Sequence, residues 1–204
     1  MTSKILLASG NAKKLAELRR VVEAAGITGL EVLGLADVEP YPEPVEDGAT
    51  FEDNALIKAR VAAQKSGLPS LADDSGLTVD ALNGMPGVLS ARWSGGKGDQ
   101  ANNDLLLAQL SDVPDSRRGA AFVSVCALVL PDGGETVVRG EWRGTVVREE
   151  RGANGFGYDP LFIPADDVAQ GRSSAELAAE EKDALSHRGK ALAQLVPALR
   201  ALAQ

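Results

Sequence analysis

Short apolar runs alternate with amphipathic stretches along this chain, and the alternation predicts an α/β protein. Aliphatic runs at residues 5–8, 32–35 and 120–130 are typical of buried strands. The tetrapeptide Pro131-Asp132-Gly133-Gly134 predicts a hairpin turn after the third run. Two further strands are expected at residues 136–139 and 145–148. Because hairpin signals accompany the crossovers, we expect a mixed sheet flanked by helices.

Helix signals separate and follow these strands. Thr50 with Asp53, and later Ser173 with Glu176, form capping-box patterns that predict helix starts. Gly26 is a plausible end for the first helix. Apolar or small residues at helical spacing are Leu15, Leu18, Val22 and Ala25, then Ala55, Ala59, Ala62 and Ala63, and finally Leu192, Leu195, Val196, Leu199 and Leu202. Pro197 is expected to bend the last helix, and the prolines at 40, 42 and 44 predict an extended segment without a helix.

Composition excludes several classes of protein. The formal net charge of -8 argues against a main role in gripping nucleic acid phosphates. No run approaches the roughly 20 apolar residues of a membrane span, and the start does not resemble a secretory signal. A single cysteine, Cys126, lies in an apolar run and is expected in the core, without a disulfide framework. The reducing cytoplasm is the expected location.

The segment Ala72-Asp73-Asp74-Ser75-Gly76 places two carboxylates next to each other at the expected end of a strand. Side chains alternate along a strand, so Asp73 and Asp74 cannot act as a matched pair on one face. One interpretation gives one carboxylate to a hard cation and the other to a neighbouring polar partner. The other is an Asp-rich turn, in which Asp74 binds loop amides and Gly76 supplies a positive φ.

Two more polar segments lie toward the N-terminus. Ser9-Gly10-Asn11-Ala12-Lys13-Lys14 joins a strand to a helix, where glycine, free N–H groups and lysine suit a phosphate; an ordinary capped helix explains it equally well. Glu46 lies before the helix that starts at Thr50, and Lys58 lies within that helix. Glu46 could join Asp74 in binding Mg²⁺, and Lys58 could contact a phosphate oxygen. The competing interpretation is surface charge favoured by the helix dipole.

The last two segments carry aromatic and cationic groups. In the glycine-rich loop 152–160, Phe156 or Tyr158 could stack on a base, or both could simply cover the core. Residues 180–189 contain the only histidine, His187, together with Lys182 and Arg188. Cations near a helix start gain nothing from the dipole, so these side chains are expected to face groups that accept hydrogen bonds. One histidine and one cysteine cannot form a Cys/His zinc site.

Taken together, five motifs in order resemble the inosine triphosphate pyrophosphatase family, the dITP/XTP or non-canonical purine NTP pyrophosphatases. They are Ser9-Gly10-Asn11-Ala12-Lys13-Lys14, Thr50-Phe51-Glu52-Asp53-Asn54-Ala55, Ala72-Asp73-Asp74-Ser75-Gly76, Gly155-Phe156-Gly157-Tyr158-Asp159-Pro160 and Ser186-His187-Arg188-Gly189. The resemblance spans nearly the whole chain. It implies a single domain over residues 1–204, with two lobes around an elongated mixed sheet, a cleft between them, and usually a homodimer.

The resemblance also implies a reaction and its residues. ITP, dITP and XTP would be hydrolysed to the monophosphate and pyrophosphate with Mg²⁺. The segment from Ser9 to Lys14 (Ser9, Gly10, Asn11, Ala12, Lys13 and Lys14) and Lys58 would hold the triphosphate, with Ser75 beside them. Asp74 would carry Mg²⁺ and activate water, with Asp73 as the competing base; Glu46 is the second metal ligand, with Glu43 as the alternative. Phe156, Gly157, Tyr158, Asp159, Lys182, His187 and Arg188 would surround the base. The alternatives are a pyrophosphatase for other modified nucleotides and a nucleotide sensor without catalysis.

Overall fold

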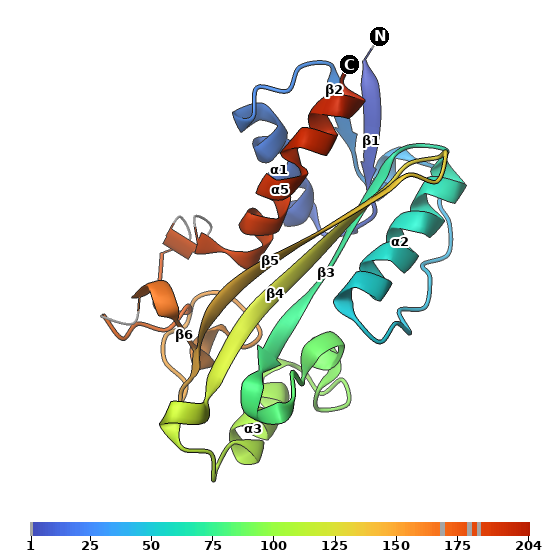
Figure 1. The fold of residues 1–204 in the computed structure, drawn as a ribbon. Helices are drawn as coiled ribbons and strands as arrows, with labels where there is room; N and C mark the ends of the chain where they lie inside the picture. The colour runs from blue at the N-terminus through green and yellow to red at the C-terminus, as the bar shows by residue number, and fades with distance from the viewer. Residues whose placement is uncertain (1, 168–169, 179–180, 183–184) are drawn as a thin grey trace. The chain divides into compact units, whose positions relative to one another are not determined.

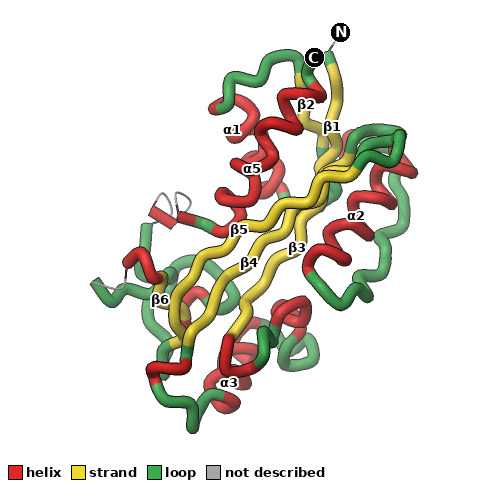
Figure 2. The backbone as a smooth tube through the Cα atoms, in the orientation of Figure 1, coloured by secondary structure: helices red, strands yellow, loops and turns green. Residues whose placement is uncertain are grey.

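The structure is a computed structural model that describes residues 2–167, 170–178, 181–182 and 185–204 (Figure 1). Strands and helices alternate through the first half of the chain, and Figure 2 marks the two kinds of element by colour. In chain order the elements are β1 (Ser3–Leu7), α1 (Ala12–Ala24), β2 (Leu30–Leu33), α2 (Phe51–Ser66), β3 (Ser70–Val79), α3 (Asp99–Gln109), β4 (Gly119–Val129), β5 (Glu135–Val146), β6 (Phe162–Pro164) and α5 (His187–Leu202). Short 3₁₀ turns lie between several of them.

The strands form one mixed sheet in the order β2-β1-β3-β4-β5-β6. β1 pairs with β2 and β3 in parallel, whereas β5 and β6 are antiparallel. Between β4 and β5 the expected hairpin turn is present, since Leu130 N donates to Gly134 O over 2.8 Å. The predicted α/β class with a mixed sheet is therefore confirmed.

Local capping explains where the first two helices begin. The Asn11 side chain accepts a hydrogen bond from Lys13 N at 2.9 Å, which satisfies a free donor at the start of α1. At α2, Thr50 Oγ1 accepts from Asp53 N, and the Asp53 carboxylate accepts from Thr50 N. The capping box predicted from the sequence is confirmed. Residues 39–48, which contain the three prolines, form no helix or strand.

The C-terminal helix signals are met only in part. Glu176 accepts a hydrogen bond from Ser173 N at 2.7 Å, so that half of the second capping box is present. Residues 177–178 are not helical, and residues 179–180 lie outside the described part of the chain. α5 contains Pro197 and the predicted apolar positions.

The prediction of two separate strands at 136–139 and 145–148 is wrong, because β5 is continuous from Glu135 to Val146. Gly140 and Gly144 interrupt the sequence pattern but not the strand, and alternate residues from Gly140 to Val146 remain buried or half-buried. β6 and α3 were not predicted from the sequence either. β6 has only three residues, and α3 buries two asparagines among its core-facing residues.

β3 likewise extends further than expected. The strand runs through Asp73, Asp74 and Gly76 to Val79, so these residues are not in a turn at its end. Gly76 does not have a positive φ. Glycine is needed there for a different reason: a Cβ atom would meet Ser90 Oγ and, at 2.7 Å, Gly87 O. The Asp-rich-turn interpretation is wrong.

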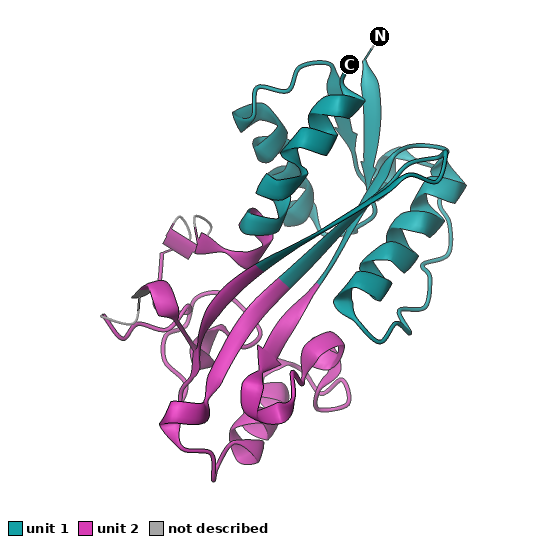
Figure 3. Cartoon of the chain, in the orientation of Figure 1, with its two compact units in different colours: residues 1–74, 124–140, 190–204 teal, residues 75–123, 141–189 magenta. Residues whose placement is uncertain are grey.

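The chain divides into two compact units (Figure 3). Unit 1 contains residues 1–74, 124–140 and 190–204, and unit 2 contains residues 75–123 and 141–189. Within unit 1, α1 and α5 lie on one side of the strands and α2 on the other (Figure 1). Each unit has its own apolar core: in unit 1 it includes Leu7, Leu18, Val32, Cys126, Leu128 and Leu195, and in unit 2 Leu77, Leu106, Phe122, Trp142 and Phe162. Cys126 is buried, as expected.

Candidate active site

Two neighbouring carboxylates in β3 contact different helices of unit 1. The Lys14 ammonium, in the first turn of α1, lies 2.6 Å from Asp73 Oδ2. Asn54 Nδ2, on α2, donates to Asp74 Oδ2 over 3.1 Å. This arrangement follows from strand geometry, which directs successive side chains to opposite faces. Each carboxylate therefore has its own set of partners, as the sequence led us to expect.

A second lysine lies between two carboxylates. Lys58 Nζ is 2.9 Å from Glu46 Oε2 and 3.8 Å from Asp74 Oδ1. Lys58 follows Asn54 by four residues on α2, so both side chains project from the same face of that helix. Glu46, in the loop before α2, and Asp74, in β3, are thereby directed toward one cationic group.

Asn54 also fixes the loop that carries Glu46. Its Oδ1 accepts a hydrogen bond from Gly48 N at 2.8 Å, while its Nδ2 binds Asp74, and the residue is only 1% exposed. A Cβ atom at Gly48 would meet Asp53 Cβ at 2.5 Å and Asn54 Oδ1 at 2.7 Å, so glycine permits this close approach. No role was expected for Asn54 from the sequence, in which its only signal is its position in the Thr50–Ala55 motif.

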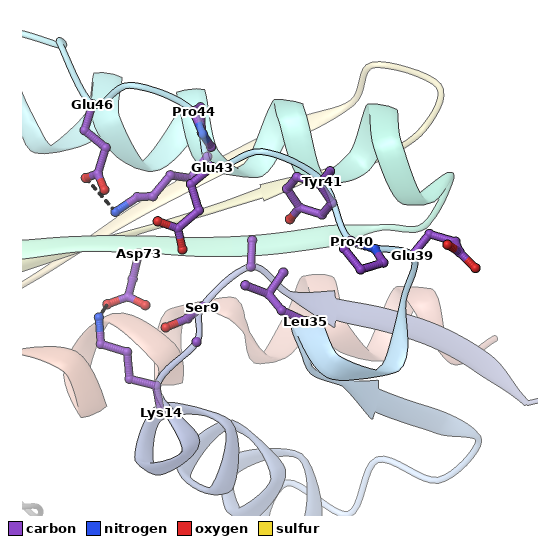
Figure 4. Close-up of a pocket in the computed structure, with 13 residues that line it drawn as sticks. Ser9, Lys14, Leu35, Glu39, Pro40, Tyr41, Glu43, Pro44, Glu46 and Asp73 are labelled. Atoms are coloured by element: carbon purple, nitrogen blue, oxygen red, sulfur yellow. Dashed lines mark hydrogen bonds and ion pairs between the residues drawn. The ribbon is translucent and has the colours of Figure 1, made fainter.

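A pocket of about 310 Å³ opens beside these groups, entirely within unit 1. Figure 4 shows Ser9, Lys14 and Asp73 on one side of it and Glu43, Glu46 and Tyr41 on the other. Cavities of roughly 300–1,000 Å³ are typical of small-molecule sites. The lining residues are Ala8, Ser9, Gly10, Lys14, Leu35, Glu39, Pro40, Tyr41, Glu43, Pro44, Glu46, Lys58 and Asp73.

The predicted phosphate segment divides into lining and supporting residues. Ser9, Gly10 and Lys14 line the pocket, whereas Asn11, Ala12 and Lys13 are exposed and are not among its lining residues. Asn11 instead caps α1, and its own N–H donates to Ser9 Oγ over 3.2 Å. Both glutamates proposed as the metal ligand, Glu46 and Glu43, line the pocket.

Tyr41 is a lining residue that the sequence did not single out. Burial, and then the neighbouring Glu43 carboxylate, raise the pKa of its phenol. The hydroxyl is therefore protonated at neutral pH and can donate a hydrogen bond. Tyr41 therefore adds a hydrogen-bond donor to a pocket lining that also contains the acceptors Glu39 and Glu43.

The donor atoms suit a hard cation. Among the described residues, no group of three or more His, Cys, Asp or Glu side chains is arranged to hold a metal ion. Mg²⁺ does not require such a group, because it is commonly bound by one or two carboxylates together with water and substrate phosphates. Glu46 and Asp74 both approach the Lys58 ammonium, so the two carboxylates can face one cation. We conclude that these residues fit Mg²⁺.

In unit 2 the structure brings together three of the residues expected around the base. Lys182 Nζ lies 2.5 Å from Asp159 Oδ2 and 5.2 Å from the centroid of the Phe156 ring. Phe156 N donates to the same Asp159 oxygen over 2.9 Å. Asp159 is buried, whereas Phe156 is 80% exposed.

The other expected base-site residues of unit 2 differ in their surroundings. Tyr158 is buried, and its hydroxyl donates to Ser90 O over 2.8 Å, so of the two aromatics it is Phe156 that presents its ring. Burial, and then Asp99, raise the pKa of the Tyr158 phenol. The His187 ring stacks on Phe122 with centroids 5.3 Å apart, and Arg188 is 8% exposed. Ser75, which was expected beside the triphosphate and not the base, follows Asp74 in β3 and is half-buried.

The fold and these groups define an α/β protein with a pocket of paired lysines and carboxylates. The chain belongs to the Ham1 family, whose sequence profile matches residues 5–198. The family resemblance expected from the five motifs is thereby confirmed. No helix in the described part of the chain has the length and apolar character needed to cross a bilayer.

Similar proteins match over nearly their entire length. A Corynebacterium efficiens protein named dITP/XTP pyrophosphatase is 66% identical, covering 98% of this chain and 99% of its own. The crystal structure of a Mycobacterium abscessus nucleoside-triphosphatase, dITP/XTP pyrophosphatase, has 63% identity and a TM-score of 0.82, covering 97% of this chain and 100% of its own. A HAM1 protein from Coxiella burnetii has 42% identity and a TM-score of 0.87, covering 98% and 99%.

Proposed function

We propose that this chain hydrolyses the non-canonical purine nucleoside triphosphates dITP, XTP and ITP to the monophosphate and pyrophosphate. The observation that carries the proposal is the pocket in which Lys14 pairs with Asp73 and Lys58 pairs with Glu46. Two lysines can neutralise phosphate charge there, beside carboxylates that can bind a cation and activate water. The name dITP/XTP pyrophosphatase, carried by relatives at 66% and 63% identity, gives the substrate class.

The phosphates would be held by Ser9, Gly10, Lys14 and Lys58. Both lysine ammonium groups already lie in or beside the pocket, and each can exchange its carboxylate partner for a phosphate oxygen. Lysine suits this role as a compact charge with rotatable donors. Asn11 supports it by fixing the start of α1, whose free N–H groups favour anions.

Glu46 and Asp74 would hold Mg²⁺, with Glu43 as the alternative to Glu46. When bound there, the ion neutralises charge on the phosphate oxygens and the pyrophosphate leaving group. Asp74 would take a proton from water as the water oxygen attacks the α-phosphorus. The bond from that phosphorus to the bridging oxygen then breaks, and pyrophosphate leaves. Asp73 is the less suited base, because its side chain is almost fully buried against Lys14.

Base selection would reside in unit 2. Phe156 offers an exposed ring for stacking, and Lys182, which can only donate hydrogen bonds, lies beside it. Hypoxanthine and xanthine carry an acceptor oxygen at position 6, where adenine carries a donor. His187, Arg188 and Asp159 complete the proposed set around the base. A site built for such hydrogen bonds can reject a mismatched analogue by roughly 10⁴-fold or more.

The test is pyrophosphate release from dITP, XTP, ITP, GTP and ATP, with and without Mg²⁺. Selective, Mg²⁺-dependent turnover of the first three supports the proposal. Equal rates on all five would indicate a broader pyrophosphatase, and binding without turnover a sensor. The proposal includes residues 1–204 acting as one functional domain in the cytoplasm, as a homodimer; light scattering of the purified protein tests the dimer.

A further inference from the structure

Phe156 is the most exposed large hydrophobic side chain in the described part of the chain, yet the backbone around it is tightly bound. Phe156 is 80% exposed, whereas Asp159, three residues further along the chain, is 2% exposed. An exposed aromatic ring gains little from the hydrophobic effect. Its position must therefore be set by contacts of the backbone and not by burial of the ring.

Two side chains of α3 form hydrogen bonds with both backbone polar groups of Gly157, the residue that follows Phe156. Gly157 N donates to Asp99 Oδ2 over 2.7 Å, and Gly157 O accepts from Asn103 Nδ2 at 3.1 Å. Asp99 and Asn103 are four residues apart on α3 and so project from one face of it. Gly157 has a φ of 61°, a left-handed conformation that glycine adopts without strain.

The opposite side of Phe156 is fixed as well. Its N–H donates to Asp159 Oδ2, and the other oxygen of that carboxylate accepts from Ser174 Oγ at 2.8 Å. Backbone groups on both sides of the Cα atom of Phe156 are thus held by side chains. Only the side-chain torsions of the Phe156 ring remain free. Because the loop is already ordered, no free energy is spent on ordering it when a planar ligand stacks on the ring.

We propose that Asp99 and Asn103 are positioning residues that hold the Phe156 ring ready to stack on the purine base. This inference rests on the proposed function and extends it to α3, which carries none of the residues expected at the site. Both side chains act through the Gly157 backbone and neither is required to touch the nucleotide. Asn103 also donates to Glu150 Oε1 at 3.2 Å, and this hydrogen bond connects α3 to the segment that precedes the loop.

The test uses Asp99→Ala in the full chain, because Asp99 is exposed and its loss leaves no cavity. With Mg²⁺ present, calorimetric titration with the two products, IMP and pyrophosphate, separates the base from the phosphates. We expect IMP to bind about 2- to 10-fold more weakly, since the loop must now be ordered on binding. Pyrophosphate affinity should stay unchanged, and Tm should fall only slightly, because Asp99 also lies in the first turn of α3, where a carboxylate favours the helix dipole.

Three variants make the result specific. Asp112→Ala removes the same charge from an exposed position three residues beyond α3 and should bind IMP like the wild type. Asp99→Asn keeps an acceptor oxygen for Gly157 N and should restore most of the affinity. In a Phe156→Ala background, Asp99→Ala should have no further effect, because its action passes through the ring.

The outcomes distinguish this inference from the proposed function. Wild-type protein that binds neither IMP nor pyrophosphate would overturn both. Wild-type protein that binds IMP, with Asp99→Ala binding it equally well, would overturn the positioning role alone. An equal loss of IMP and pyrophosphate affinity, or a loss that persists in Asp99→Asn, would also overturn the positioning role. Either result would mean that Asp99 acts through its charge or through protein stability and not by positioning the Phe156 ring.

Discussion

The ammonium group of Lys58 lies 2.9 Å from the Glu46 carboxylate, and this ion pair competes with any metal ion that Glu46 binds. Lys58→Met removes the competing cation and keeps most of the side-chain volume. We expect the nucleotide-free variant to bind Mn²⁺ about two- to fivefold more tightly, because a partly exposed ion pair contributes roughly 0.2–1 kcal/mol. Calorimetry measures the affinity directly.

Arg60→Met is the control for that measurement. Arg60 is an exposed cation on the same helix, but it pairs with Glu135, at 2.6 Å, so its removal should leave Mn²⁺ affinity unchanged. Turnover of dITP should fall in Lys58→Met, since a phosphate ligand is lost. Weaker metal binding in Lys58→Met than in the wild type would contradict the assignment of Glu46 and Asp74.

Asn54 is expected to support stability and activity together. Asn54→Ala removes the acceptor of Gly48 N and a donor to Asp74 in a buried position. The free energy of unfolding should fall by about 1–3 kcal/mol, the usual consequence of leaving a buried polar group without its partner. Urea denaturation measures it, and kcat for dITP should fall as well. Gln64→Ala, which removes an exposed amide from α2, should change neither quantity.

Asp73 and Asp74 are expected to respond differently to the same substitution. Asp74→Asn should lower kcat by about 10²-fold or more, the usual contribution of a general base, and leave the fold intact. Asp73→Asn removes the carboxylate that competes with phosphate for Lys14, so it should mainly lower KM and leave kcat nearly unchanged. Steady-state kinetics with dITP separates the two effects. The opposite result would assign the base to Asp73.

The Arg60–Glu135 pair predicts a pH-dependent contribution to stability. The hydrogen bond from Arg60 lowers the pKa of the Glu135 carboxyl below its ordinary value of 4.5. The contribution is therefore fully present above pH 4.5 and is lost as the pH falls through the lowered pKa. Urea denaturation of wild type and Glu135→Gln should show a difference at pH 7 that shrinks below pH 4.5. A difference that stays constant down to pH 3 would rule out this pair as its source.

Elements with strong local signals could be predicted from the sequence. The starts of α1 and α2 follow from Asn11 and from the Thr50–Asp53 pair, whose side chains bind backbone groups only two or three residues away. The continuity of β5 could not be predicted in this way. Gly140 and Gly144 weaken any strand pattern, and what maintains the strand is its pairing with β4 and β6, which lies outside the local pattern of residues 135–146.

The same distinction applies to the site. Alternation along a strand predicted that Asp73 and Asp74 would have separate partners, but it could not name them. Lys14 lies 59 residues from Asp73 in sequence, and Asp99 lies 58 residues from Gly157. Such contacts depend on how whole elements pack. No pattern in the sequence therefore indicated Tyr41 or Asp99, and Asn54 was indicated only by its place in a family motif.

One consequence of β3 concerns insertions and deletions. Leu6 pairs with Ser70 and Leu7 with Leu71, and this register decides which face each later side chain meets. Removing or adding a single residue between Leu71 and Asp73 would turn each acid to the opposite face of the strand while preserving both of them. The spacing of that short segment is consequently as much a determinant of chemistry as the acids themselves, and a relative with an altered spacing there would be expected to have lost the activity.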